Sequence, residues 1–365
     1  MKKACHPLHN KGNPVQQCVR CGLCLGSCSI YQITRLETDS PRGRLELMRS
    51  LAENRIISTL ELRDLFSSCL FCLQCQRDCP AGVDFDLTFF KSTAQISNQD
   101  RDIFIRGIRR ADSRCPESSP FQLKKRKEIE SKKEASEEVI FFPGCFMNEE
   151  EIAQISRFMQ TIGVDAAVLN DTCCGLPHLL NGDQKGALAC MKQNIQILNP
   201  KRVKTLLTTC PFCLDMFKRH YPRLLKRKIR LEFKHISDLC ESMISKIRLN
   251  MSKKVAYQTP CLLDTQIANH HRKMIEKLVG RSYVPIPSQI CCGYGFGLPD
   301  KRPEISHRIC QMNTQKIIEK GVQILITDCP SCTSQWQKGA REENCDLKVI
   351  PFWDFVYRLI SKMDI

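Results

Sequence analysis

The spacing of the cysteines constrains this chain more than any other feature. The sequence of 365 residues contains 24 cysteines, and eight of them form two copies of the pattern C-x2-C-x2-C-x3-C. No secretion signal precedes the first copy, and cytosolic reductants keep thiols reduced, so we do not expect a disulfide framework. Metal binding is the default interpretation of so many thiols. The two copies are Cys18, Cys21, Cys24 and Cys28, and Cys69, Cys72, Cys75 and Cys79.

This spacing is that of bacterial ferredoxins and predicts two cubane [4Fe–4S] clusters. In such a motif three closely spaced thiolates bind one cluster, while the fourth cysteine binds the other. Zinc is the alternative, but zinc favours separated C-x2-C pairs, whereas here four cysteines fall within eleven residues. Pro80 follows the second motif, and Ser29 stands at the corresponding place after the first. The predicted ligand sets are Cys18, Cys21, Cys24 and Cys79, and Cys28, Cys69, Cys72 and Cys75.

The segment between the two motifs predicts a helical domain. Forty residues separate Cys28 from Cys69, and residues 42–65 are rich in leucine and charge, with helical periodicity. The arrangement resembles the α-helical ferredoxin domain of succinate dehydrogenase-type iron–sulfur subunits. The stretch Ser40 to Leu45 is similar to the equivalent segment of the glycolate oxidase iron–sulfur subunit. We therefore expect residues 1–110 to form a helical domain with two clusters.

From residue 139 onward the chain repeats itself, which indicates a gene duplication. Each copy has a lone cysteine, a Cys-Cys-Gly triplet and a Cys-Pro-x-Cys motif, and matching cysteines are 116 to 119 residues apart. Strand-like apolar runs alternate with helical patterns. We therefore expect parallel βαβ units, whose loops gather the cysteines at the carboxyl ends of the strands. The two sets are Cys145, Cys173, Cys174, Cys210 and Cys213, and Cys261, Cys291, Cys292, Cys329 and Cys332.

The Cys-Cys-Gly triplets are interpreted as ligand turns. A disulfide between adjacent cysteines is strained, whereas two neighbouring thiolates can bind different irons of one cluster. We expect Gly175 and Gly293 to let the backbone approach the cofactor closely. Five cysteines per copy exceed the four that a cubane or a tetrahedral zinc site needs, which indicates an unusual cluster.

These sets resemble the CCG, or cysteine-rich, domains of the heterodisulfide reductase family. Similar domains occur in the iron–sulfur subunits of glycolate oxidase, D-lactate dehydrogenase and anaerobic glycerol-3-phosphate dehydrogenase. In heterodisulfide reductases a complete set binds a non-cubane [4Fe–4S] cluster, so the resemblance implies one or two such clusters here. The glycolate oxidase type usually lacks the first cysteine of the last motif, but this chain keeps both Cys210 and Cys329.

The expected fold is an α-helical two-cluster ferredoxin domain followed by a duplicated α/β CCG domain with two pseudo-symmetric lobes. We place the lobes at residues 139–250 and 251–365, after a charged linker at 111–138. The basic run at residues 124–127 of the linker is either solvated or a docking patch for an acidic partner or lipid headgroups. The net charge of +16 suits such a partner or an anionic membrane, and no recognition motif for nucleic acid accompanies it.

Six cysteines and two histidines near the motifs give weaker indications. We expect Cys115 to be a free thiol and the other unmatched cysteines to be small buried hydrophobes. His178 and His235 are either ordinary core histidines or, in one case, a proton relay. The unmatched cysteines are Cys5, Cys115, Cys190, Cys240, Cys310 and Cys345.

The sequence contains no nucleotide-binding glycine motif, so a flavin must come from a partner. We therefore predict an oxidoreductase subunit that carries electrons within a hetero-oligomeric, FAD-dependent dehydrogenase complex. The substrate would be a 2-hydroxy acid such as lactate or glycolate, or glycerol 3-phosphate, and the acceptor a quinone or a membrane-anchored protein. No apolar run can span a membrane, so we expect a cytoplasmic protein, either free or bound peripherally at the inner face of the membrane.

Two alternatives stay open at this point. The complete five-cysteine sets favour a catalytic subunit like heterodisulfide reductase, which reduces a disulfide at the non-cubane clusters. A regulatory or metal-storage protein is the other. The sequence assigns no catalytic residue.

Overall fold

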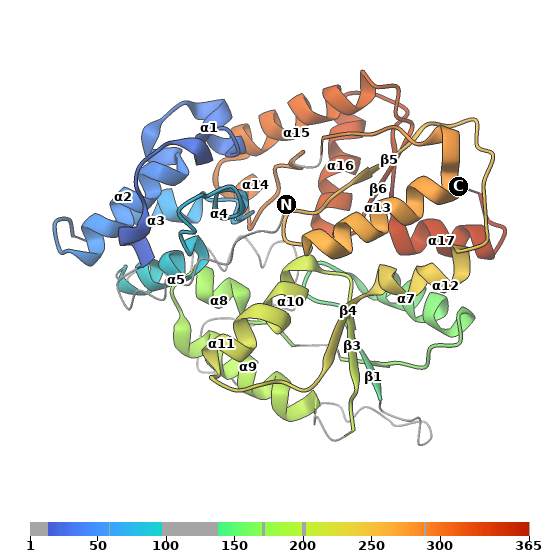
Figure 1. The fold of residues 1–365 in the computed structure, drawn as a ribbon, viewed down its shortest axis with the longest axis horizontal. Coiled ribbons are helices and arrows are strands. Elements are labelled where there is room, and N and C mark those ends of the chain that lie inside the picture. Colours follow the sequence, from blue (N-terminus) through green and yellow to red (C-terminus); the bar gives the residue numbers. More distant parts are fainter. Residues whose placement is uncertain are drawn as a thin grey trace.

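The computed structural model describes residues 14–57, 59–96, 138–169, 172–198, 202–287 and 290–364. Within these ranges the chain forms a helical module followed by two lobes, each with its own sheet (Figure 1). The predicted linker lies almost entirely outside the described residues, as do Cys5 and Cys115. Among the described helices, none is long and apolar enough to cross a membrane.

The N-terminal module consists of short helices joined by the cysteine-bearing loops, which confirms the predicted helical character. Helix α2 begins where the Ser40 hydroxyl accepts a hydrogen bond from the Gly43 amide, with Pro41 at its first position. Phe71 packs against Phe89 and Phe90 in the core of the module. The helices are α1 (Ser29–Thr34), α2 (Pro41–Ala52), α3 (Leu60–Ser67), α4 (Gln74–Arg77) and α5 (Phe85–Gln95), with 3-10 turns at Pro14–Gln17, Leu23–Leu25 and Glu37–Asp39.

The first lobe contains a parallel sheet with the strand order β2-β1-β3-β4. Its central strands are apolar and largely buried, as expected for a parallel sheet covered by helices on both faces. The elements are β1 (Val139–Phe142), α7 (Glu149–Thr161), β2 (Ala167–Val168), α8 (Leu176–Leu180), α9 (Gln184–Leu198), β3 (Thr205–Thr208), α10 (Pro211–Asp215), a π-helical turn (Met216–His220), α11 (Tyr221–Leu224), β4 (Glu232–His235), a 3-10 turn (Ile236–Cys240) and α12 (Glu241–Ile244).

The second lobe contains a parallel sheet with the strand order β5-β6-β7. A single parallel bridge from Val255 in β5 to Tyr283 stands where β2 pairs with β1 in the first lobe. The parallel strands predicted for both copies are thus confirmed, while the pseudo-symmetric relation of the lobes and the exact domain boundaries stay predictions. The elements are β5 (Val255–Gln258), α13 (Thr265–Val279), a 3-10 turn (Gly280–Ser282), α14 (Leu298–Lys301), α15 (Pro303–Ile318), β6 (Ile324–Thr327), α16 (Pro330–Glu342), β7 (Lys348–Pro351) and α17 (Phe352–Ile360).

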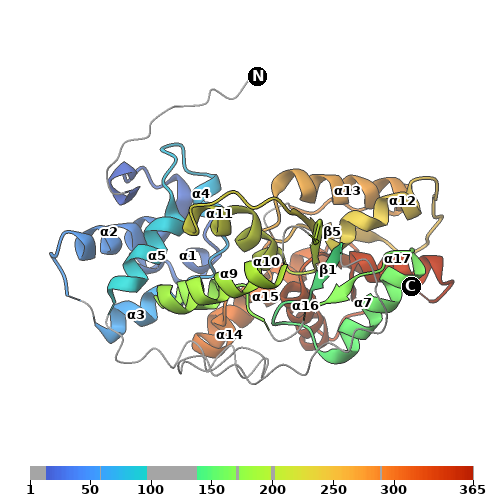
Figure 2. The same ribbon diagram turned by 90° about the horizontal axis from the view of Figure 1, so that it is seen from below.

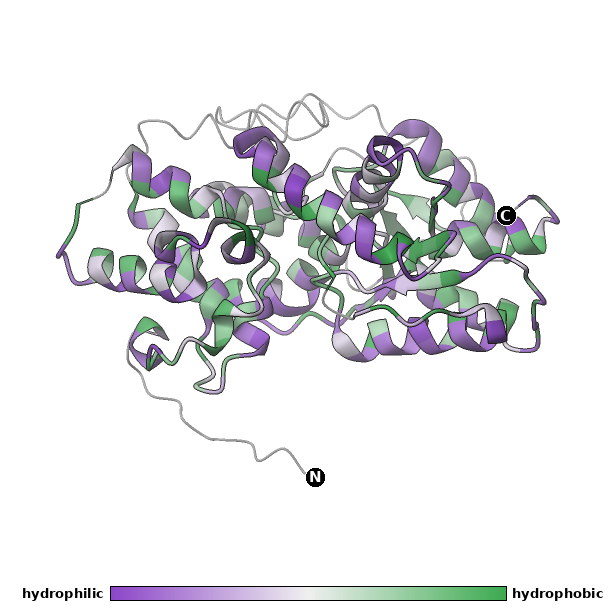
Figure 3. Ribbon diagram, turned by 90° about the horizontal axis from the view of Figure 1, so that it is seen from above, coloured by the Kyte–Doolittle hydropathy of each residue, from purple (hydrophilic) through white to green (hydrophobic). Residues whose placement is uncertain are grey.

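The helical module lies at one end of the molecule and packs against both lobes (Figures 1 and 2). Towards the second lobe, the buried Asp39 carboxylate accepts hydrogen bonds from Arg302 at 2.7 and 2.9 Å and from Arg44 at 3.2 Å. Towards the first lobe, the Arg219 guanidinium lies 2.9 Å from the buried Asp86 carboxylate. Apolar residues concentrate on the strands and on the helix faces that meet them, and one hydrophobic core runs through the module and both lobes (Figure 3).

The loop after α8 offers a test of the contact between the module and the first lobe. A Cβ on Gly182 (φ +78°) would lie 2.3 Å from the Thr93 carbonyl oxygen of α5, whereas a Cβ on Gly163 (φ +74°) would meet nothing within 4 Å. Alanine therefore brings similar backbone strain at both positions and a steric clash at Gly182 only. We expect Gly182→Ala to lower the free energy of unfolding by about 2 kcal/mol more than Gly163→Ala, measured by urea denaturation. Equal losses would contradict this packing.

Candidate metal centres

The described residues include all eighteen predicted ligand cysteines, and none of the eighteen is in a disulfide. As predicted, the carboxyl ends of parallel strands carry several of them: Cys145 follows β1, Cys210 follows β3, Cys261 follows β5 and Cys329 follows β6. The structure brings the eighteen together in four groups, two in the helical module and one in each lobe.

The first group surrounds a small cavity in the helical module. Cys18, Cys21, Cys24 and Cys79 line it, together with Cys75 of the neighbouring group. Burial and the nearby thiols of Cys18, Cys79 and Cys21 raise the pKa of Cys24 to about 11. The last cysteine of the second motif thus lies with the first three of the first motif, as the ferredoxin spacing predicts.

The second group shows the reciprocal exchange, with Cys28 of the first motif beside Cys69, Cys72 and Cys75. Burial raises the pKa of Cys72 to about 12, with further contributions from Cys69 and Cys28. Burial also raises the pKa of Cys75, and the thiols of Cys72, Cys69 and Cys28 add to the effect. The thiols of Cys72 and Cys75 are thus kept protonated by burial and by their neighbours, so binding of a cationic metal centre would release their protons.

The distances between the donor atoms disfavour the zinc alternative. Four sulfurs around a zinc ion with Zn–S bonds of about 2.3 Å lie about 3.8 Å apart. In the part of the chain that the structure describes, the one group of three or more donors lying within 4.8 Å of one another is His235, His271 and Asp328. No three of the described cysteine sulfurs are this close to one another, so none of the groups has the arrangement of a zinc tetrahedron. Their all-thiol donor sets fit iron–sulfur clusters.

The third group lies in the second lobe, directly beside the second group of the module. The Sγ atoms of Cys332 and Cys292 are 3.3 Å apart. Burial raises the pKa of Cys261, and the neighbouring thiols of Cys72 in the module and of Cys291, Cys329 and Cys292 add to the effect. Arg77 connects the two groups, because its guanidinium donates to the Cys261 carbonyl at 2.5 Å and to the Cys72 carbonyl at 3.3 Å.

The fourth group lies in the first lobe. Cys174 contacts Cys173 and Cys213, and Cys213 contacts Cys210. Cys145 completes the group from the loop after β1, where a Cβ on the preceding Gly144 would lie 3.2 Å from the Cys213 Sγ.

Tyr294 lies between the groups of the two lobes. Its ring contacts Phe146 of the first lobe, with the ring centroids 5.6 Å apart. Burial raises the pKa of Tyr294 to about 12, with contributions from Asp300 and from Cys145, Cys292 and Cys329. The phenol is therefore neutral at physiological pH, and it has cysteines of both lobes as neighbours.

Gly175 and Gly293 occupy equivalent left-handed positions, with φ of 90° and 85°. Their amides donate hydrogen bonds of 3.3 Å to the Sγ atoms of Cys173 and Cys291. A Cβ on Gly293 would lie 2.8 Å from the Ser306 carbonyl oxygen. Glycine is thus required by the backbone conformation and by the packing against the next helix, while close approach to a cofactor stays a prediction.

Cys190 is a residue whose position the sequence analysis did not anticipate. It is buried, as expected, but its thiol contacts Cys173 and faces His178. The contact with Cys173 lowers the pKa of Cys190, and His178 lowers it further. Burial opposes both effects, and the pKa is about 6. Burial alone would lower the pKa of His178, but Cys190 and Asp183 raise it to about 9. His178 Nδ1 lies 2.9 Å from the Asp183 carboxylate.

Comparison of the two copies of the repeat shows that Cys190 is peculiar to the first lobe. Asn194 and Asn313 donate equivalent hydrogen bonds to the carbonyls of Cys173 and Cys291, and they are 119 residues apart. The same offset places Cys190 opposite Ile309, and both side chains pack against the glycine of their triplet. The first lobe therefore has a sixth thiol beside its cysteine set, where the second lobe has isoleucine.

Comparison with known proteins agrees with this arrangement. The family described as "4Fe-4S dicluster domain" matches residues 14–83, and the family described as "Cysteine-rich domain", or CCG, matches residues 139–218 and 255–337. The chain belongs to the CCG-domain iron–sulfur proteins. This family assignment confirms the resemblance that the sequence analysis drew from the paired cysteine motifs.

Relatives of this CCG protein are similar over nearly its whole length. A subunit of the dihydromethanophenazine:CoB–CoM heterodisulfide reductase of Methanosarcina barkeri is 23% identical, over 91% of this chain and 90% of that protein. The glycolate oxidase iron-sulfur subunit of Escherichia coli is 23% identical, over 90% of this chain and 91% of that protein. A crystal structure of a hypothetical protein from Helicobacter pylori is similar with a TM-score of 0.56 at 10% identity, covering 92% of this chain and 70% of that one, which supports the fold.

The buried His271 makes the stability of the CCG protein depend on pH. Burial lowers its pKa, but Asp328 and Asp238 outweigh this effect and raise the pKa from 6.5 to about 9. The contribution of charged His271 to stability is therefore complete below about pH 6.5 and is lost as the pH rises through about 9. We expect His271→Gln to cost about 3 kcal/mol at pH 7, because it leaves buried carboxylates unpaired, and to abolish this decline.

The neighbouring His270 supplies the control for this prediction. It is exposed and lies 3.2 Å from Glu241, so His270→Gln should change the free energy of unfolding by less than about 1 kcal/mol. Urea denaturation of both variants between pH 6 and pH 10 is the measurement. An undiminished loss of stability at alkaline pH in His271→Gln would contradict the assignment.

Proposed function

We propose that this chain is the electron-transfer subunit of a hetero-oligomeric oxidoreductase complex whose partner contains FAD. The partner would oxidise a 2-hydroxy acid such as lactate or glycolate, or glycerol 3-phosphate, and the electrons would reach a quinone or another acceptor. Relatives that are subunits of glycolate oxidase and of heterodisulfide reductase support an oxidoreductase role. The observation that carries the proposal is the spatial order of the four cysteine groups.

The four groups follow one another from the surface of the module to the first lobe. Cys21 of the first group is exposed and has two exposed apolar neighbours, Val19 and Leu23. The second group adjoins the first through Cys24 and Cys75, and it adjoins the third through Cys72 and Cys261. Tyr294 has cysteines of the third and fourth groups as neighbours. Such a series is suited to moving electrons over a distance.

We assign the ligands of each site on this arrangement. Clusters bound there would supply reversible one-electron oxidation and reduction. Two cubane sites are in the module, and each lobe has a five-cysteine site for a non-cubane cluster, as the complete CCG sets imply. The sets are Cys18, Cys21, Cys24 and Cys79; Cys28, Cys69, Cys72 and Cys75; Cys145, Cys173, Cys174, Cys210 and Cys213; and Cys261, Cys291, Cys292, Cys329 and Cys332.

Residues around the sites set their environment. The amides of Gly175 and Gly293 donate to ligand sulfurs, which stabilises the thiolate form. The Arg44 guanidinium lies near Cys28 and favours the same form there. Arg77 holds the module against the second lobe through the carbonyls of two proposed ligands. The chain thereby fixes the separation between two neighbouring sites of different domains.

Substrate-dependent reduction of the isolated complex tests this proposal. We expect the complex, purified anaerobically from its source, to contain a flavoprotein and to become reduced at its iron–sulfur centres when the 2-hydroxy acid is added. Cys72→Ser should preserve assembly but lower the rate of this reduction at least tenfold, because Cys72 is the ligand nearest to the second lobe. Cys345→Ser, which removes a thiol outside the four groups, is the control. Electron paramagnetic resonance (EPR) and stopped-flow absorbance are the measurements.

One cavity favours disulfide reduction as a second candidate function. A cavity of about 440 Å³ opens between the lobes, and Cys329, Phe146 and Trp353 line it together with polar side chains. A disulfide bound there would lie beside a proposed ligand of the second lobe. Oxidation of the reduced protein by a disulfide, abolished by Cys292→Ser and independent of any flavoprotein, would favour this function. Absence of a flavoprotein from the native complex would contradict the first proposal.

A further inference from the structure

We propose that His235 is a positioning residue that fixes the separation of the metal sites in the two lobes by donating hydrogen bonds to both Cys-Pro-x-Cys loops at once. This inference rests on the proposed function, since it requires that both lobes bind clusters. It concerns the relation between the sites, which neither the family match nor the ligand sets determine.

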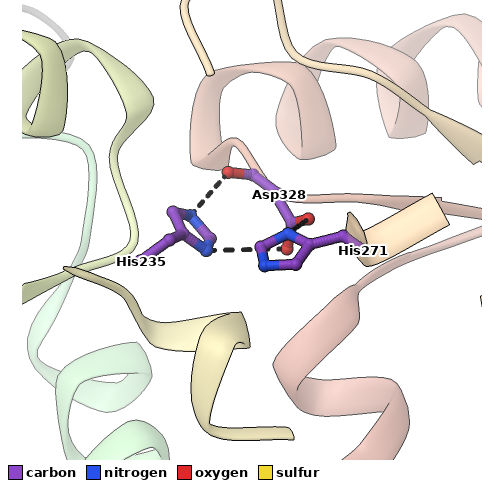
Figure 4. Close-up of side chains that lie close together, drawn as sticks. All are labelled: His235, His271 and Asp328. Atoms are coloured by element: carbon purple, nitrogen blue, oxygen red, sulfur yellow. Dashed lines mark hydrogen bonds and ion pairs between the residues drawn. The ribbon is translucent and has the colours of Figure 1, made fainter. Parts of the chain in front are cut away.

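His235 is the last residue of β4, and its side chain is buried between the lobes (Figure 4). Its Nε2 lies 2.9 Å from the Thr209 carbonyl oxygen in the first lobe and 2.9 Å from the Asp328 carbonyl oxygen in the second. Its Nδ1 accepts a hydrogen bond of 3.2 Å from the Ser237 amide. Because Nδ1 is an acceptor, Nε2 carries the proton and shares it between the two carbonyls.

The two carbonyls occupy equivalent places in the repeat. Thr209 directly precedes Cys210, and Asp328 directly precedes Cys329, 119 residues later. Each of these cysteines forms the N-cap of the following helix, α10 or α16. Because the peptide group is planar and rigid, a hydrogen bond that fixes the carbonyl also restricts the position of the cysteine after it. One imidazole thus connects the first cysteines of both Cys-Pro-x-Cys motifs.

A residue of the first lobe makes this connection, and its counterpart in the second lobe does not. His235 is paired with Thr208 in the register of β3 and β4, and Pro351 is paired with Thr327 in the register of β6 and β7. Pro351 is therefore the counterpart of His235, and its side chain has no hydrogen-bond donor. Gene duplication alone therefore does not explain the hydrogen bonds of His235, since the second copy has proline at the equivalent position.

The lobe interface has other polar contacts that would survive the loss of His235. The Asp328 carboxylate accepts a hydrogen bond from Ser237 of the first lobe and another, at 2.7 Å, from Tyr257 of its own lobe. His271 lies 2.8 Å from Asp328 and 2.6 Å from Asp238 of the first lobe. A variant at His235 should therefore fold with its lobes in contact while losing the link between the two backbone carbonyls.

A metal ion is the competing explanation of this histidine cluster. His235, His271 and Asp328 offer donor atoms within 4.8 Å of one another (Figure 4). Both nitrogens of His235 are already engaged, and His271 lies between two carboxylates that hold it in its protonated form. Hydrogen bonds therefore satisfy the imidazoles without an ion, and we assign the cluster a positioning role.

The magnetic coupling between the two lobe sites provides the test. His235→Phe keeps a ring of similar size but removes the donor, whereas His235→Gln keeps an amide with two N–H groups that can reach both carbonyls. In the anaerobically purified full-length protein, we expect His235→Phe to retain its iron and to broaden the distribution of couplings, measured by pulsed EPR, at least twofold. His235→Gln should restore the wild-type distribution. Tyr257→Phe, which removes a contact to the Asp328 side chain only, should leave it unchanged.

Each possible outcome decides the inference. If His235→Phe loses iron, His235→Asn replaces it, because the shorter amide reaches at most one carbonyl and should give the same broadening. Wild-type coupling in an iron-replete His235→Phe or His235→Asn variant would overturn the inference and leave the proposed function intact. Absence of iron from the lobes of the wild-type protein would overturn both. If the wild-type protein contained one zinc ion per chain and His235→Phe lost it, then His235, His271 and Asp328 would be a metal site. This result would overturn the positioning role.

Discussion

Burial of many thiols without enough positive charge beside them is the constraint on which the rest of the structure depends. Burial raises the pKa of cysteines in the module and in the second lobe, among them Cys72, Cys75 and Cys261. A core of protonated thiols this crowded gains little from hydrogen bonding, because the thiol is a weak donor and acceptor. A bound metal centre compensates for the burial of thiolates, so folding and cluster binding are expected to be coupled.

The distances between the sites follow from how the helical module and the two lobes pack against one another. The helical module docks on the second lobe through Arg77 and through the buried Asp39, which bonds to Arg302. It reaches the first lobe through α5 and α8, which are in contact. These contacts place the second group of cysteines beside the second lobe and not beside the first. The lobe that is later in the sequence is thus the nearer one to the N-terminal sites.

Much of this arrangement could be predicted from the sequence, because it depends on local spacing. The C-x2-C-x2-C-x3-C pattern predicted that Cys79 would lie with the first motif and Cys28 with the second, and the structure places them so. The constant offset of the repeat predicted two similar parallel sheets. Both inferences rest on short loops whose geometry few residues determine.

What the sequence did not disclose depends on contacts between distant segments. Cys190 was grouped with ordinary buried cysteines, because nothing near it in the chain indicates that α9 packs against Cys173. His235 was noted only as a histidine near a motif, since its link to Asp328 spans 93 residues. The docking of the module on the second lobe likewise depends on tertiary packing, which cysteine spacing does not encode.

Quantification of iron and acid-labile sulfide in protein prepared without oxygen tests the central claim most directly. Four occupied [4Fe–4S] sites predict about 16 irons and about 16 sulfides per chain. A colourless preparation that contains no labile sulfide, with zinc in place of iron, would contradict the account.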